Sequence, residues 1–248
     1  YIIKKFGKEN YENLIYVNFE MNQELSSQIS ESIDAKYIIN KLELFYGEKI
    51  IPGKTLIFFD EIQANERALT SLKYFYEERP DYHIIVAGSL LGVAVNRARF
   101  SFPVGKVDMK TLYPMDLQEI MIAMGENSLV DQIKKCFETN ESMPSALHDA
   151  AMQLYRQYLV VGGMPECVMQ FAETKDYILI RHTQDTILAS YLNDMSKYNN
   201  LNEIKKTRLA YDNITVQLSK KNTRFQYKVI KKGGRASEFE NAIEWLCL

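Results

Sequence analysis

The sequence predicts an α/β fold with a parallel β-sheet in its N-terminal part, followed by a mostly helical C-terminal domain. Three apolar segments, 14–19, 55–60 and 83–88, are typical of strands buried on both faces, because apolar and polar residues do not alternate regularly along them. Residues 37–45 and 66–78 lie between these strands and carry apolar side chains at helical spacing. Strands that alternate with helices favour a parallel sheet with right-handed crossovers.

Two adjacent carboxylates, Asp60 and Glu61, follow the apolar run Leu56–Phe59 directly. In open α/β sheets, ligands bind at the carboxyl edge of the strands. At this place Asp60 could help to hold Mg²⁺ and Glu61 could act as a general base. The alternative interpretation is a core strand that ends in two solvated acids without a catalytic role. Ser89 follows Gly88 at the end of the next strand. It is expected at the same edge, as a γ-phosphate sensor or as a helix cap.

Four segments resemble a group of prokaryotic AAA-superfamily P-loop ATPases that carry a C-terminal domain of unknown function: IFFDEIQ (57–63), IIVAGSLLGVAV (84–95), FPVGKVDMKTLYPMDLQEI (102–120) and YLVVGGMPE (158–166). The last of these resembles the glycine-rich start of the second domain, so the resemblance covers nearly the whole chain. It implies a P-loop NTPase-like core that takes ATP and Mg²⁺ as cofactors.

The resemblance also implies roles for individual residues. Asp60 would be the Walker B aspartate on the metal, Glu61 the catalytic base and Ser89 the sensor-1 residue. ATPases of this superfamily often need a cation at the transferring phosphate, from the same chain or from a neighbouring subunit. Arg97, Arg99 and Lys106 are therefore candidates for contacting ATP, and ordinary surface charges are the alternative. A homo-oligomer is one expected arrangement.

The phosphate-binding loop of this family, G-x-x-x-x-G-K-[ST], does not occur in these 248 residues. Gly53-Lys54-Thr55 resembles its tail, but it lacks the earlier glycine and precedes a strand instead of a helix. The first residues, 1–6, resemble the helix that would follow such a loop, and 237–248 resembles a helix cut at its end. We therefore expect a fragment of an ATPase. The fragment itself is expected to be inactive and to bind ATP poorly, because Asp60 and Glu61 add only negative charge.

Polar, turn-rich residues at 125–128 and 139–144 indicate a domain boundary. We expect an ATPase core over 1–125, without its phosphate loop, and a helical domain over 126–248.

Three local signals refine this organisation. Tyr113 and Pro114 are expected to end the last strand of the sheet, with Asp116 as the cap of the next helix. Gly162-Gly163 is expected to mark a helix end and a tight turn, and a nucleotide-contacting loop is the less favoured interpretation.

Basic residues gather near the C-terminus. Residues 197–235 hold eleven Lys and Arg against two acidic residues, a net charge of +9 in a chain whose overall charge is −2. Residues 203–216 are expected to be helical, 225–230 alternate like a strand or an exposed wing, and another helix starts near Ser237. This order predicts a winged helix-turn-helix over about 197–248 that contacts DNA or another acidic partner, and a basic face in an interdomain contact is the alternative. The candidate nucleic-acid ligands are Lys220, Lys221, Arg224, Lys228, Lys231, Lys232 and Arg235.

Composition and residue placement argue against several other classes of protein. Hydrophobic residues make up 46% of the chain, but the longest apolar stretch, 84–95, is too short to span a bilayer. No signal peptide is visible, so we expect a cytoplasmic protein without a membrane contact. The three cysteines and three histidines are scattered and show no zinc-ligand spacing. His83 is expected to be a structural residue at the start of a strand.

The function that these features predict is ATP-driven mechanical or switching work, in which ATP binding and hydrolysis alter the contact between the core and the helical domain. The alternative is a non-enzymatic DNA-binding regulator whose ATPase-like core serves as a scaffold. The coding sequence upstream of Tyr1 discriminates between them, because an intact phosphate loop supports the first and a degenerate one supports the second.

Overall fold

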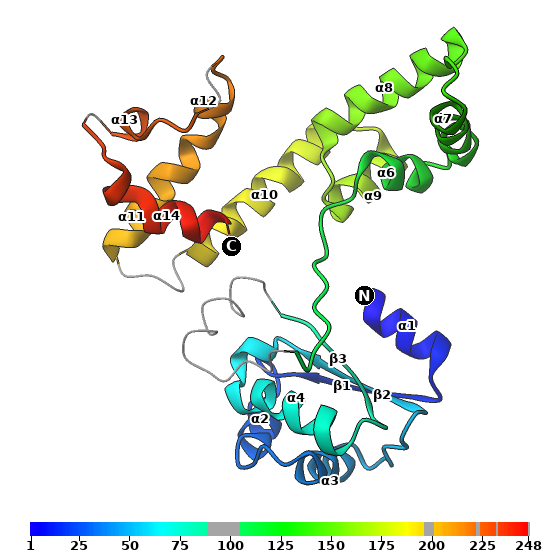
Figure 1. Cartoon of the computed structure of the whole chain (residues 1–248), viewed down its shortest axis with the longest axis vertical. Helices are drawn as coiled ribbons and strands as arrows, with labels where there is room; N and C mark the ends of the chain where they lie inside the picture. Colours follow the sequence, from blue (N-terminus) through cyan, green and yellow to red (C-terminus); the bar gives the residue numbers. More distant parts are fainter. Residues whose placement is uncertain (89–104, 196–200, 222–223, 232, 248) are drawn as a thin grey trace. The chain divides into compact units, whose positions relative to one another are not determined.

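A computed structural model of the chain (Figure 1) describes residues 1–88, 105–195, 201–221, 224–231 and 233–247. The chain divides into two compact units, an N-terminal unit over Tyr1–Thr111 and a C-terminal unit over Leu112–Cys247. Each unit has its own hydrophobic core. Among the described helices, none combines the length and the apolar character that crossing a membrane requires.

The described part of the N-terminal unit has three strands joined by helices. Its elements are α1 (Ile2–Asn10), β1 (Asn13–Asn18), α2 (Gln23–Ile29), α3 (Ala35–Tyr46), β2 (Thr55–Asp60), the 3₁₀ turn η1 (Ile62–Ala64), α4 (Glu66–Glu78) and β3 (His83–Val86). The strands lie in the order β1–β2–β3 and all run parallel, with Asn18 opposite Asp60 and Phe59 opposite Val86. The predicted parallel sheet is confirmed, although its third strand ends at Val86.

The two faces of this sheet are covered by different helices (Figure 1). Successive side chains of a strand point to opposite faces. Ile15 and Phe59 lie on the face that α2, α3 and α4 cover, where both are fully buried. Burying a side chain of this size stabilises the fold by about 1.5–3 kcal/mol. On the other face, a Cβ atom on Gly7 of α1 would lie only 3.0 Å from Leu14 and 3.1 Å from Leu56, so glycine allows α1 to lie close to the sheet.

Local signals set the ends of α3 and α4. Asp34 Oδ1 accepts the Tyr37 N–H at 2.6 Å, and Asn65 Oδ1 accepts the Ala68 N–H at 2.9 Å. Both side chains satisfy a backbone donor that the first helical turn leaves without a partner. Gly47 ends α3 with a φ of 69°, a left-handed conformation that favours glycine. The helices predicted around 37–45 and 66–78 are thereby confirmed.

The described residues of the C-terminal unit form helices and connecting segments without a strand. The helices are α6 (Leu117–Ala123), α7 (Asn127–Thr139), α8 (Ser145–Val161), α9 (Pro165–Thr174), α10 (Tyr177–Met195), α11 (Leu201–Asp212), α12 (Ile214–Leu218), α13 (Tyr227–Ile230) and α14 (Ala236–Cys247). Helices α6, α8, α9 and α10 share a core that includes Val161 and Phe171. Met121 of α6 packs with Leu129 of α7, and Phe239 is the largest buried side chain where α11, α13 and α14 meet.

The predicted last strand of the sheet, ahead of Tyr113, is wrong. Residues 108–116 belong to no strand or helix. A strand needs a neighbour that pairs with its backbone N–H and C=O groups, and within the described residues the sheet contains only β1, β2 and β3. Met115 instead donates its N–H to the carbonyl of Gly163 at 2.7 Å. The predicted cap is confirmed, because Asp116 forms a capping box at the start of α6.

Gly162-Gly163 ends α8 as predicted. Gly162 has a φ of 73°, and its N–H bonds to the Tyr158 carbonyl at 2.8 Å. A Cβ atom on Gly163 would overlap the backbone carbonyl oxygen of Met115, so this position has no room for a side chain. Pro165 then occupies the first turn of α9, where its missing N–H costs no helical hydrogen bond.

The predicted wing over 225–230 is wrong. Residues Tyr227–Ile230 form a helical turn, α13, and not an extended strand. Tyr227 and Ile230 both pack in the cluster around Phe239. Residues three apart lie on one face of a helix but on opposite faces of a strand. Packing on Phe239 therefore selects the helical conformation.

The segment before α13 also differs from the winged-helix prediction. The helix expected over 203–216 is two helices, α11 and α12, separated at Asn213. Gln217 of α12 bonds to both backbone groups of Gln226: its Nε2 donates to the carbonyl at 2.9 Å, and its Oε1 accepts the N–H at 3.1 Å. These bonds replace those that a neighbouring strand would make. The helix expected near Ser237 is confirmed as α14.

Candidate functional site

Asp60 and Glu61 lie at the carboxyl end of β2, the middle strand of the described sheet. The five residues of β2 that precede Asp60 are buried, whereas Asp60 is half-buried. Asn18, the last residue of β1, lies opposite Asp60 in the sheet register. The two carboxylates therefore lie at the edge of the sheet where the sequence predicts them.

The Asp60 carboxylate is held by two hydrogen bonds. Tyr16 of β1 donates its hydroxyl to Asp60 Oδ2 at 2.8 Å, and the Glu61 N–H donates to Oδ1 at 3.2 Å. The Tyr16 ring contacts Phe58, and the Lys4 ammonium of α1 lies 3.3 Å from the ring centroid. Helix α1 thus brings a positive charge next to the side chain that orients Asp60.

Helix α3 holds Tyr16 in turn. Tyr46 donates its hydroxyl to the backbone carbonyl of Tyr16 at 2.6 Å. Burial raises the pKa of Tyr46, because a phenolate would be poorly solvated there, so the hydroxyl remains a donor. Sequence reasoning missed Tyr16. The available signal was one hydroxyl-bearing side chain within the otherwise apolar run at 14–17.

Glu61 has an unusual backbone conformation and a side-chain partner. Its φ of 54° and ψ of 43° lie in the left-handed region, which few residues other than glycine adopt. Gln63 of η1 donates its Nε2 to Glu61 Oε2 at 2.6 Å. The turn at Glu61 and the bond from Gln63 together set the direction of the carboxylate.

Three of the other predicted site residues lie outside the described part of the chain: Ser89, Arg97 and Arg99. Lys106 is described, and it forms an ion pair with Glu77 at 3.4 Å. The chain that leads to Ser89 stays paired with β2 beyond the end of β3. Ala87 donates its N–H to the Phe59 carbonyl at 2.8 Å, and Ile62 donates its N–H to the Ala87 carbonyl at 3.1 Å. Ala87 therefore lies at the same sheet edge as Asp60 and Glu61.

The described residues contain no group of three or more His, Cys, Asp and Glu side chains that could hold a metal ion. Asp60 offers a single carboxylate, already oriented by Tyr16. Proteins usually bind Mg²⁺ through one or two carboxylates together with waters and substrate phosphates. This donor set therefore fits an ion that arrives with a phosphate ligand.

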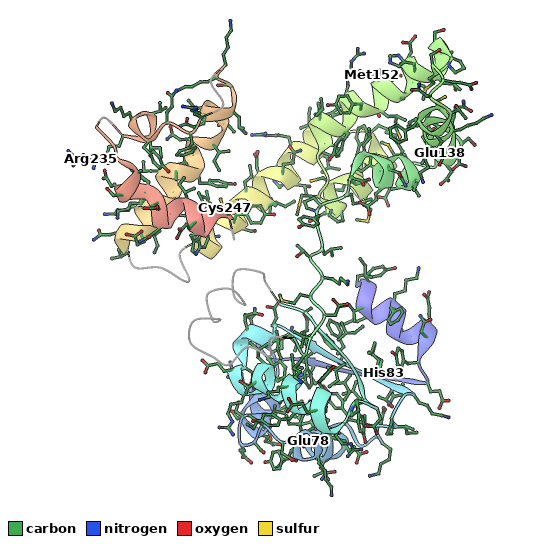
Figure 2. The ribbon with its side chains drawn as sticks, in the orientation of Figure 1. Glu78, His83, Glu138, Met152, Arg235 and Cys247 are labelled. Atoms are coloured by element: carbon green, nitrogen blue, oxygen red, sulfur yellow. The ribbon has the colours of Figure 1, made fainter. Side chains whose placement is uncertain are left out.

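The candidate nucleic-acid ligands lie from the segment after α12 to the segment before α14. Five of these residues are exposed: Lys221, Arg224, Lys228, Lys231 and Arg235, the last of which is labelled in Figure 2. Lys231 forms an ion pair with Glu238 at 2.9 Å, and this bond holds the pKa of Glu238 below its usual value. Lys220 is half-buried, and Lys232 lies outside the described residues.

Two further predictions concern histidine and cysteine. His83, labelled in Figure 2, begins β3. Its Nδ1 is 2.9 Å from the Tyr11 hydroxyl, so it links β3 to the end of α1 as a structural residue. Cys167 is buried in the core of α6, α8, α9 and α10, and burial raises its thiol pKa. This thiol therefore lacks the thiolate character of a nucleophile.

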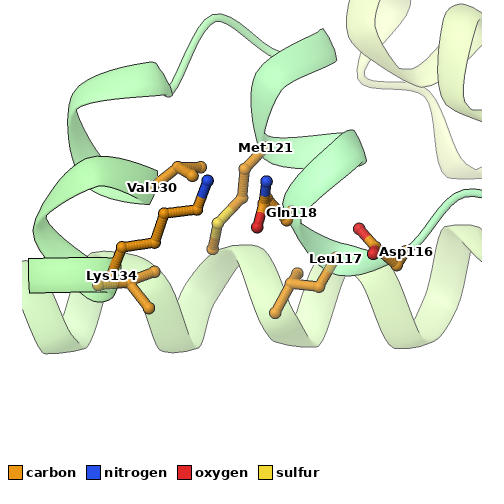
Figure 3. Close-up of a pocket in the computed structure, with 7 residues that line it drawn as sticks. Asp116, Leu117, Gln118, Met121, Val130 and Lys134 are labelled. Carbon is orange, nitrogen blue, oxygen red and sulfur yellow. The ribbon is translucent and has the colours of Figure 1, made fainter. Parts of the chain in front are cut away.

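A pocket of about 300 Å³ lies between α6 and α7 (Figure 3). Its walls are mostly apolar, and its polar lining residues are Asp116, Gln118 and Lys134. The residues that line the pocket are Asp116, Leu117, Gln118, Met121, Val130, Ile133 and Lys134. None of them belongs to the predicted site. We assign the pocket no function.

Comparison with known families identifies two parts of the chain. Residues 1–121 match the family model of an AAA domain, and residues 152–248 match a domain of unknown function (DUF8612). A search of curated proteins found no match. The predicted order, an AAA-like part followed by a domain of unknown function, is confirmed. The prokaryotic origin and the phosphate loop stay predictions.

Proposed function

We propose that the AAA-like part of this protein binds and hydrolyses ATP with Mg²⁺ in the cytoplasm, and that its nucleotide state acts on the C-terminal domain. The observation that carries this proposal is the pair of carboxylates at the end of β2 in an AAA-like domain. Each carboxylate is oriented by a dedicated partner, Tyr16 for Asp60 and Gln63 for Glu61. Two solvated acids at a strand end would not need such partners.

The two carboxylates would have different roles. Asp60 would hold the metal ion, since a hard cation prefers a charged oxygen ligand. Bound Mg²⁺–ATP would supply the phosphoryl group and the charge that stabilises its transfer. Glu61 accepts the Gln63 amide on one oxygen, and its carboxylate would orient a water molecule and accept its proton. Ser89, Arg97 and Arg99 are the proposed phosphate contacts. A basic side chain from a neighbouring copy of the chain is the alternative source of positive charge at the transferring phosphate.

Glu61→Gln and Asp60→Asn test these roles in the protein expressed from its complete gene. Glu61→Gln should leave the Kd for ATP within about twofold but slow hydrolysis by about 10²–10⁴-fold, because an amide cannot accept the proton of water. Asp60→Asn should instead weaken Mg²⁺-dependent ATP binding. Nucleotide titration and phosphate release measure the two effects.

Glu66→Gln is the matched control, because Glu66 is an exposed carboxylate in the first turn of α4. Glu66→Gln should change neither the Kd for ATP nor the rate of hydrolysis. Equal turnover in the wild type and in Glu61→Gln would remove Glu61 from the catalytic role.

A second candidate function is binding of DNA through the C-terminal domain, with the AAA-like part as a scaffold. The observation that favours it is the net charge of +9 over 197–235, with Lys221, Arg224, Lys228 and Arg235 exposed. Basic side chains on one segment are the usual electrostatic footprint of a nucleic-acid partner. Binding of duplex DNA at increasing salt concentration tests this function, and Glu61→Gln should not affect that binding.

A further inference from the structure

The Gln63 side-chain amide lies between Glu61 and Gly88: its Nε2 donates to Glu61 Oε2, and its Oε1 lies against Gly88. We propose that Gln63 is a positioning residue for Glu61, and that Gly88 is a glycine because the Gln63 amide occupies the space where a side chain would lie. This inference rests on the proposed role of Glu61 in ATP hydrolysis. It adds a physical link between the end of β3 and the catalytic carboxylate.

The backbone around Glu61 is held by a buried neighbour and by two hydrogen bonds. Ile62 is fully buried, and its N–H bonds to the carbonyl of Ala87. The Ala64 N–H bonds to the Glu61 carbonyl at 2.9 Å, which closes the 3₁₀ turn η1. Residues 61–64 are therefore held against the extension of β3. Gln63 projects from this turn and reaches Glu61 Oε2 at 2.6 Å.

Gly88 follows the β3 extension and lies against Gln63. Its φ is not positive, so the backbone conformation at this position does not require glycine. Space at this position is taken by a side chain: a Cβ atom on Gly88 would overlap Gln63 Oε1, the end of that side chain, and would lie 3.3 Å from Ile62 Cγ2. Any side chain at position 88 must therefore displace the Gln63 amide or move the β3 extension.

The hydrogen bond from Gln63 has a chemical consequence for Glu61. The Gln63 amide occupies one Glu61 oxygen and fixes the plane of the carboxylate, which leaves a defined direction for the water that Glu61 would orient. A general base must be placed to within a fraction of an ångström, and a displacement of about 1 Å can cost up to about 10²-fold in rate. Loss of the Gln63 contact should therefore lower kcat and leave nucleotide affinity nearly unchanged.

Gln63→Ala, Gly88→Ala and the double variant test the link in the protein expressed from its complete gene. Each single variant should lower kcat about ten- to hundredfold, with the Kd for ATP within about twofold. The double variant should be no slower than the slower single variant, because both changes remove the same contact. Gln23→Ala, at an exposed residue of α2, is the matched control and should turn over like the wild type.

A spectroscopic readout needs no nucleotide. The side-chain amide resonances of Gln63, assigned by their loss in Gln63→Ala, should shift in Gly88→Ala and in Glu61→Ala but not in Glu66→Gln. Thermal unfolding of each variant separates a positioning effect from misfolding, and Gln63→Ala keeps the test valid if Gly88→Ala does not fold.

The outcomes distinguish this inference from the proposed function. Slow turnover in Glu61→Gln, with wild-type turnover in Gln63→Ala and Gly88→Ala, would overturn the positioning role and leave the function standing. Additive losses in the double variant would also overturn the link. Wild-type turnover in Glu61→Gln would remove Glu61 from the catalytic role and, with it, the positioning role of Gln63. Absence of ATP binding and turnover in the wild type would overturn the proposed function itself.

Discussion

Individual side chains in the N-terminal unit are held by specific partners from other elements. Tyr16 and Asp60 are far apart in the sequence but meet because β1 and β2 pair in register. Glu43 is a similar case away from the site. Its Oε2 accepts the Lys49 ammonium at 2.8 Å, and its Oε1 accepts the Ile50 N–H at 3.0 Å. These bonds attach the end of α3 to the segment that leads into β2.

The first prediction at the residue scale is a pH dependence that arises from Glu43. The hydrogen bond from Lys49 and then that from the Ile50 N–H lower the pKa of Glu43 below its ordinary value of 4.5. A lowered pKa in the folded state stabilises the fold above the pKa of the unfolded state. This contribution is complete above about pH 4.5, and it is lost as the pH falls through the lower folded value. At neutral pH, Glu43→Gln should lower the free energy of unfolding by about 1 kcal/mol.

Urea unfolding of the wild type and of Glu43→Gln from neutral to acidic pH measures this effect. The difference in free energy of unfolding between the wild type and Glu43→Gln should shrink as the pH falls below about 4.5. Glu24→Gln, at an exposed residue of α2, is the control and should match the wild type at every pH. A difference that stays constant from neutral to strongly acidic pH would rule out the charged carboxylate as its source.

At the scale of elements, short segments in the C-terminal unit take their conformation from side chains and backbone groups elsewhere. Residues 225–230 alternate like a strand, yet α13 forms because Tyr227 and Ile230 pack together near Phe239. Gly163 shows the same dependence on distant residues, since it accommodates the backbone of Met115.

The prediction at this scale concerns the bridge from Gln217 to Gln226. Gln217→Leu keeps the size of a largely buried side chain but removes both of its bonds to the Gln226 backbone. Leaving those groups without their partner should cost about 1–3 kcal/mol. Amide hydrogen exchange at Gln226 should become faster. Fluorescence of Trp245, the one tryptophan in the sequence, reports unfolding of the same unit.

Gln217→Glu is the informative comparison, because a carboxylate accepts the Gln226 N–H but cannot donate to its carbonyl. Its effect should lie between the wild type and Gln217→Leu. Unchanged exchange at Gln226 in Gln217→Leu would show that the bridge does not hold this segment.

At the scale of the whole molecule, charge is divided unequally along the chain. The net charge of +9 over 197–235 lies within the part that matches the domain of unknown function, and the rest of the chain carries −11. The proposed ATP site in the AAA-like part and the basic segment in the C-terminal domain are therefore separate electrostatic features. The first feature predicts binding of ATP, and the second predicts binding of DNA.

The prediction for the basic segment is binding of duplex DNA that weakens steeply with salt. Log K should fall linearly with log salt concentration, with a slope of about −0.9 for each phosphate contacted. A triple variant to glutamine at Lys221, Arg224 and Lys228 should weaken binding and make the slope shallower by up to about 3. Fluorescence anisotropy with a labelled duplex measures both quantities.

The control removes three exposed lysines from the N-terminal unit: Lys8, Lys36 and Lys110. This variant has the same net charge as the first but keeps the basic segment intact, so its salt slope should equal that of the wild type. Equal losses of DNA affinity in the two triple variants would indicate that the net charge of the protein alone attracts the DNA.

The sequence by itself determined the features that depend on local patterns. Continuous apolar runs specified the three strands, helical periodicity specified the helices between them, and Asp116 marked the start of α6. The end of an apolar run placed Asp60 and Glu61 at the carboxyl edge, because a strand's end follows from its own residues. The catalytic and cofactor roles of these two residues, and those of Ser89, Arg97 and Arg99, stay predictions.

Only the tertiary structure decided which distant residues meet. The sheet register brought Tyr16 to Asp60, and the β3 extension brought Gly88 against Gln63. Packing also decided between helix and strand at 227–230, because a short segment with apolar residues two and three apart is compatible with both periodicities. The physical reason is common to all three cases. A local pattern encodes the shape of one segment, whereas a contact depends on the position of its partner.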